Sequence, residues 1–129
     1  MNRDAKLLDL RENVFGEIGS LISDEEKFQN QTLRPILKLQ NEILLQLSIN
    51  HIQKYIKNFR QQTIAIKTTQ IENAIQKDHK FKNLLIGTIV GHFTINEYVL
   101  YTQNQSNLNK RLITMLVERI NSQIQLLDI

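Results

Sequence analysis

The sequence predicts an all-α fold: a helical bundle of four to six helices with a long C-terminal helix, formed by residues 1–129 as a single helical domain. Three observations lead to this prediction. Apolar residues recur at steps of three and four along most of the chain, N-terminal capping signals precede several of these segments, and the only proline lies where a helix is expected to begin. A chain of this length can bury an ordinary single core.

The composition excludes several classes of function. The chain has no cysteine, which excludes disulfides, thiolate metal sites and cysteine nucleophiles. Its N-terminus has acidic residues within an apolar pattern, unlike a signal peptide, and no apolar run approaches the roughly 18 residues that a membrane span needs. We therefore expect a soluble, cytoplasmic protein without membrane contact.

The charge is unevenly distributed. The net charge is +3, yet residues 1–31 hold four basic and seven acidic side chains, whereas residues 32–129 hold twelve basic and six acidic ones. The acidic N-terminal part is expected to pack on the basic remainder and partly neutralise it. The basic residues of interest are Lys77, His79, Lys80, Lys82, Lys110, Arg111 and Arg119. A nucleic-acid accessory role is a further alternative, although these residues show no helix-turn-helix spacing.

Helical signals continue through the first half of the chain. The first helix is predicted from Asp4 to Ile22, and Ser23 with Glu26 forms a capping box that opens a short turn toward Phe28. The buried stripe of the first helix is predicted to be Leu7, Leu10, Val14, Ile18, Leu21 and Ile22. Residues 28–31 are predicted to be a linker.

A second long helix is predicted from Thr32, its cap, to about Asn58, with Pro35 in the first turn. Its apolar residues cover a wide arc, which indicates a central helix with Ile43 and Leu47 in the core. Residues 60–67 are predicted to be a loop or a fraying helix end.

Two further helices are predicted before the C-terminal third. Thr69 is expected to cap a helix that ends near Lys77, and Asp78 caps the next one, through Val90. Gly91 fits the left-handed stop that often ends a helix.

The last third, Thr94 to Leu127, is predicted to be one unbroken helix that starts with a Thr94–Glu97 capping box. It would be roughly 50 Å long, more than the roughly 36 Å diameter of a compact chain of this size. A break near Gln105, within the polar stretch 104–107, is the alternative. An overhanging helix would need cover, and we expect a homodimer as that cover, with the first helix as competitor. The expected interaction surface is Leu112, Met115, Leu116, Ile120 and Ile124.

Few residues suggest catalysis. An enzyme or metal-binding protein would use His51 or His92 with Glu97, and Tyr101 and Arg111 are weaker polar candidates. The chain lacks Glu-x-x-His and His-Glu-x-x-His spacings, a Walker motif and a Gly-x-Ser-x-Gly elbow. We expect no cofactor and no bound metal, with Glu97 in a structural capping role and His51 in the core.

Two groups of segments show a resemblance to known proteins. They are Phe28, Thr32-Leu33-Arg34-Pro35-Ile36-Leu37-Lys38-Leu39-Gln40-Asn41 and Glu42, and then Phe81 to Gly91, Phe93-Thr94, Glu97, Tyr101 and Asn109-Lys110-Arg111. Nearly the whole chain resembles a family of small bacterial all-helical proteins of uncharacterised function. The resemblance implies a self-standing helical domain and supplies no catalytic residues. Some members are labelled glyoxalase, but βαβββ glyoxalases use paired strands and His/Glu metal ligands, and this chain offers neither.

These observations favour a protein that acts by protein–protein interaction or assembly, with itself as a homodimer or with another protein. Direct nucleic-acid binding is not favoured.

Overall fold

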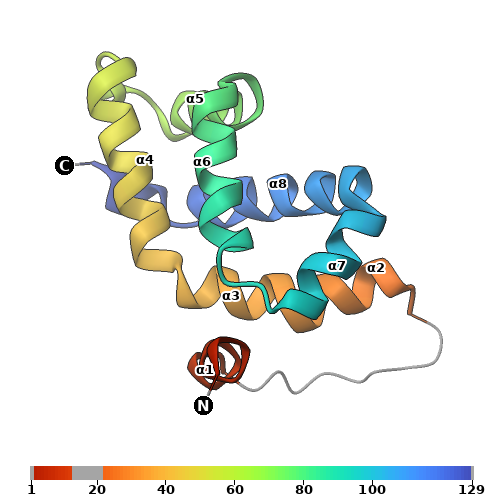
Figure 1. Cartoon of the computed structure of the whole chain (residues 1–129). Coiled ribbons are helices and arrows are strands. Elements are labelled where there is room, and N and C mark those ends of the chain that lie inside the picture. The colour runs from red at the N-terminus through yellow and green to blue at the C-terminus, as the bar shows by residue number, and fades with distance from the viewer. Residues whose placement is uncertain (1, 13–21, 129) are drawn as a thin grey trace.

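The computed structural model describes residues 2–12 and 22–128, and every regular element within them is helical (Figure 1). The order is α1 (Arg3–Leu10), α2 (Asp24–Phe28), a π-helix (Gln29–Leu33), α3 (Arg34–Leu39), α4 (Asn41–Tyr55), a 3-10 turn (Phe59–Gln61), α5 (Ile64–Lys77), α6 (His79–Val90), α7 (Ile95–Gln103), α8 (Gln105–Asn121) and a second 3-10 turn (Ile124–Leu127). The all-α prediction is confirmed. Within the described ranges, no helix has both the length and the apolar character needed to span a membrane.

Helix α8 is the element on which the others pack. Figure 1 shows α4 and α6 beside each other with α8 crossing them, and α8 also contacts α5, α7 and the π-helix. Leu108, Leu112, Leu116 and Ile120 follow one another at steps of four and form a single buried stripe along it. This stripe explains why α8 can serve as the central element of the bundle.

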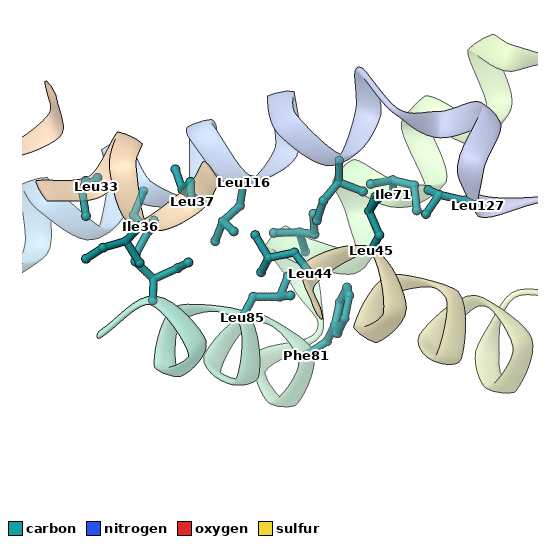
Figure 2. Packing of buried hydrophobic residues seen from close by; sticks show 14 of the residues in the cluster. Leu33, Ile36, Leu37, Leu44, Leu45, Ile71, Phe81, Leu85, Leu116 and Leu127 are labelled. Atoms are coloured by element: carbon teal, nitrogen blue, oxygen red, sulfur yellow. The ribbon is translucent and has the colours of Figure 1, made fainter. Parts of the chain in front are cut away.

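The core is formed by aliphatic side chains from most of the helices. Figure 2 shows Leu33, Ile36 and Leu37 meeting Leu85 and Leu116, with Leu44, Ile71 and Phe81 further along the same cluster. Burying each such side chain contributes roughly 1.5–3 kcal/mol. The bundle therefore depends on this shared apolar cluster, to which helices from both halves of the chain contribute.

The first helix is much shorter than predicted within the described residues. α1 ends at Leu10, with Arg11 in an extended C-cap conformation. None of its residues is buried, so the predicted burial of Leu10 is wrong. The predicted positions Val14, Ile18 and Leu21 lie outside the described residues.

Residues 28–31, predicted to be a linker, are helical, and the chain runs as one helical stretch from Asp24 to Leu39. A π turn precedes Pro35. In a regular α-helix the proline ring would collide with the carbonyl of residue 31. The proline therefore gives a physical reason for the wider π turn at this point. Thr32 is consequently a buried residue inside this stretch and not a helix cap.

The second long helix is divided into α3 and α4 by a bend at Gln40 (φ −91°, ψ 7°). The buried face of α4 also differs from the predicted one. Ile43 is 46% exposed, so its predicted core position is wrong, whereas Leu44 is 1% exposed. Leu47 is half-buried against the core.

The middle of the chain also differs from the prediction. α5 begins at Ile64 and is capped by Thr63, whose hydroxyl accepts from the Ile66 N–H at 3.2 Å. Thr69 lies inside this helix and is not a cap. Asp78 caps α6 as predicted, but Gly91 is right-handed (φ −60°) and makes no left-handed stop.

The C-terminal third is not one unbroken helix. Asn104 (φ −144°, ψ 40°) separates α7 from α8, which confirms the alternative of a break near Gln105. The Asn104 side chain does not cap α8; its amide donates instead to the Glu25 carboxylate at 2.8 Å and so ties the break to α2. The break directs α8 into the bundle instead of beyond it.

The expected interaction surface is therefore inside the molecule. Leu112, Leu116 and Ile120 are fully buried, Ile124 is buried, and Met115 packs half-buried against the same core. Helix α8, which holds most of them, packs against α4, α5, α6, α7 and the π-helix of the same chain. These residues do not form an exposed dimer surface, and none of the described helices overhangs the bundle, because α8 begins at Gln105 and turns back into it.

Candidate functional site

The most strongly connected polar residue is Glu97, in the first turn of α7. The capping box predicted with Thr94 is present in full: the Glu97 N–H donates to the Thr94 hydroxyl at 3.1 Å, and the Thr94 N–H donates to the Glu97 carboxylate at 2.8 Å. The same carboxylate accepts from two nitrogens of Arg11, at 2.7 and 2.8 Å, and from the Thr32 hydroxyl at 2.7 Å. Glu97 thus joins α7 to the end of α1 and to the π-helix.

This ion pair is largely removed from solvent. The Arg11 side chain is 6% exposed and that of Glu97 is 14% exposed. Burial alone would raise the pKa of Glu97, but hydrogen bonds from Arg11, the Thr94 backbone and Thr32 outweigh it and lower the pKa below 4.5. Glu97 is therefore held as a carboxylate with its oxygens occupied, which suits a structural role better than proton transfer.

His92 lies at the same corner, between α6 and α7. Its backbone carbonyl accepts from Arg11 at 2.7 Å, and its buried Nδ1 has no hydrogen-bond partner among the described residues. Burial, together with the charges of Arg11 and Arg3, lowers the pKa of His92. His92 and Glu97 are thus linked through Arg11, which donates to the His92 carbonyl and to the Glu97 carboxylate.

His51 lies elsewhere, on the inner side of α4. Its ring stacks on Phe81 at 4.1 Å between centroids with an interplanar angle of 12°, and Nε2 is 4.0 Å from the Asp78 carboxylate. Burial lowers the pKa of His51, and Asp78 opposes this in part. The predicted core position of His51 is confirmed, and its acidic neighbour is Asp78 instead of Glu97.

Tyr101 and Arg111 take separate structural positions. The buried Tyr101 packs edge-on against Phe93 and donates its hydroxyl hydrogen bond to Asn109, and burial raises the pKa of the phenol. Arg111 on α8 pairs with Glu25 at 3.2 Å and donates to Gln29 at 2.9 Å. The five polar candidates therefore do not converge on one site.

The outward face of α7 is the most unusual exposed feature. Ile95, Tyr98 and Val99 are between 47% and 63% exposed, and Leu100 beside them is 47% exposed. Only Tyr101 of this helix is buried. A surface helix normally places polar residues on its solvent side, so an apolar outward face is a candidate contact surface.

Sequence reasoning missed Arg11, Thr32 and the α7 face. The contact of Arg11 with Glu97 spans 86 positions and leaves no local pattern. The α7 face did have a signal, because no charged residue occurs between Glu97 and Lys110. The prediction of one unbroken helix hid this signal. It placed the apolar residues of α7 and α8 on a single stripe, so that those of α7 were not recognised as a separate face.

No three His, Asp or Glu side chains come together in a metal-binding arrangement among residues 2–12 and 22–128. No protein-family model, curated protein or solved structure matches this chain. The resemblance to small bacterial helical proteins accordingly stays an expectation.

Proposed function

We propose that this protein acts by assembly, and that it associates with a second copy of itself through the outward face of α7. A cytoplasmic location is part of this proposal. The observation that supports it most directly is the spacing of Ile95, Tyr98 and Val99, which places three exposed apolar side chains on one side of a short helix.

The chemistry of this face suits contact with another protein. Exposed apolar side chains gain free energy when a partner removes them from water, at about 25 cal/mol per Å². Interface centres are poor in charged residues and rich in tyrosine, and α7 has Tyr98 on this face. Its only charged residue, Glu97, is already paired with Arg11 on the inner side.

The lack of charged residues in α7 after Glu97 favours a second copy as the partner. In a two-fold symmetric dimer the same patch meets itself, so any charge near the axis would face a like charge. From Tyr98 to Asn109 the chain contains no charged residue. This stretch can therefore oppose itself without repulsion, whereas a charged partner surface would find no counter-charge on it.

Sedimentation equilibrium tests the proposal with a matched pair of variants. Ile95 and Ile64 are both the first residue of a helix, both follow a threonine cap, and are 63% and 70% exposed. We expect the wild type to dimerise at roughly micromolar concentration. Ile95→Glu should be monomeric, because it buries a charge at the interface, and Ile64→Glu should dimerise like the wild type.

Two results would overturn the proposal. One is a mass that stays near the 15.1 kDa of a single chain on concentrating the wild type. The other is a dimer that Ile95→Glu leaves unchanged, since the second copy would then bind elsewhere.

A further inference from the structure

A basic groove lies between the π-helix and α3 on one side and α8 on the other. It encloses about 600 Å³, and its lining includes four cationic side chains: Arg34, Lys110, Arg111 and Arg119. Glu118 is the one acidic residue of the lining. A groove of this volume falls in the range of small-molecule sites. We name it the α3–α8 groove.

Most of this positive charge is not neutralised by the protein. Arg111 pairs with Glu25, but across residues 2–12 and 22–128 no carboxylate lies within 4.0 Å of Arg34, Lys110 or Arg119. Arg34 donates instead to the Asn30 amide oxygen at 2.9 Å. Arg119 donates to the Asn41 amide oxygen at 3.2 Å. Neutral amides position these guanidinium groups without cancelling their charge.

The two arginines also repel each other. Partial burial lowers the pKa of Arg119, and the nearby charge of Arg34 lowers it further. Holding two like charges at one groove costs free energy, and an anion placed between them would remove that cost. Guanidinium groups are well suited to this, because their planar N–H donors match the oxygens of a phosphate.

We propose that the α3–α8 groove binds a phosphate or polyphosphate group of a small molecule with at least two negative charges. Arg34, Arg119 and Lys110, which all line the groove, supply the charge that would bind the phosphate. No aromatic side chain lines the groove, so it has no stacking platform for bases of the kind that single-stranded nucleic acid uses. The recognised chemistry is therefore the phosphate itself.

This site is independent of the proposed dimer. None of the exposed apolar residues of α7 lines the α3–α8 groove. A failure of one proposal would leave the other standing.

Isothermal titration calorimetry with inorganic pyrophosphate at low ionic strength tests the site. Each of Arg34→Gln and Arg119→Gln should weaken binding about tenfold or more, because each removes a charge-assisted contact. Arg60→Gln is the matched control: it removes the same charge from an exposed arginine of the 3-10 turn 59–61, outside the groove lining. It should bind pyrophosphate like the wild type.

Circular dichroism melting of each variant shows whether it remains folded. Because Arg34 is exposed, we expect Arg34→Gln to remain folded. This variant therefore tests the proposal even if Arg119→Gln unfolds. The absence of pyrophosphate binding at about 1 mM would overturn the proposal, as would an equal loss in Arg60→Gln. A single-stranded oligonucleotide that binds through Arg34 and Arg119 where pyrophosphate does not would also overturn it, in favour of a nucleic-acid role.

Discussion

At the residue scale, Glu97 shows how one side chain can serve two purposes. Its capping role follows from four consecutive residues and could be predicted from the sequence. Its bond to Arg11 could not, because nothing in the local pattern indicates that the end of α1 lies against α7. Thr32 completes the arrangement from a third element. A local hydrogen bond can thus be predicted from the sequence, whereas a long-range ion pair can be identified only once the fold is known.

Glu97→Gln should lower the free energy of unfolding by about 3 kcal/mol, since it leaves the buried Arg11 without a counter-charge. This is more than the roughly 1 kcal/mol expected for a cap alone. Urea denaturation measures it. Glu72→Gln, on the exposed side of α5, is the control and should change stability by less than about 0.5 kcal/mol.

A double-mutant cycle with Arg11→Gln separates the ion pair from the cap. If the two substitutions were additive, the Arg11–Glu97 contact would contribute nothing beyond the individual losses, and the assignment of the pair as a fixed link would be wrong.

At the element scale, the second long helix differs from its prediction in two ways: it bends at Gln40, and Ile43 is not part of its core face. A continuous helix from Thr32 would carry the stripe of Ile36 on through Ile43 and Leu47. In α4 the buried apolar residues are instead Leu44, Leu45, Ile49 and Ile52, while Ile43 is 46% exposed. Periodicity fixes a face only within an unbroken helix, and Gln40 has no sequence feature that predicts a bend.

Two neighbouring residues test this assignment. Leu44→Ala should cost about 3 kcal/mol, because it leaves a cavity in the core. Ile43→Ala should cost less than about 1 kcal/mol, because that side chain is nearly half exposed. Chemical denaturation measures the free energy of unfolding of both variants. A larger loss for Ile43→Ala than for Leu44→Ala would show that Ile43, and not Leu44, faces the core.

At the scale of the whole molecule, the fold class was predictable and the arrangement was not. Helix periodicity and the caps at Ser23, Asp78 and Thr94 are local properties, and all three caps are present in the structure. The choice of α8 as the central element depends on which helices meet, and a single sequence gives no information on that. Individual residues of the candidate site, such as Glu97 and His92, could be predicted from the sequence, but their contacts with Arg11 and Thr32 could not.

Stability should fall as the solution is acidified. The pKa values of His51 and His92 are lowered from 6.5 and that of Glu97 from 4.5. The unfolded chain therefore binds more protons, so these contributions are complete above the unfolded values and are lost as pH falls through the folded ones. Urea denaturation between about pH 7.5 and pH 4 measures this loss.

His51→Gln should reduce the part of the pH dependence that lies just below pH 6.5. A stability that instead rises on acidification through this range would contradict the direction assigned to both histidines.

The interruption at Asn104 has a consequence for how many chains share one core. If residues 104–107 were replaced by alanines, α7 and α8 would tend to fuse into one rod of about 27 residues, roughly 40 Å long. The second half of that rod could no longer return to its own bundle and would take the equivalent place in a neighbouring molecule, an exchange of identical segments between chains. Size-exclusion chromatography should show a dimer that persists on dilution and also in an Ile95→Glu background. The polar break at residues 104–107 thus keeps each chain closed on itself, and its loss would turn a self-contained bundle into an interlocked pair.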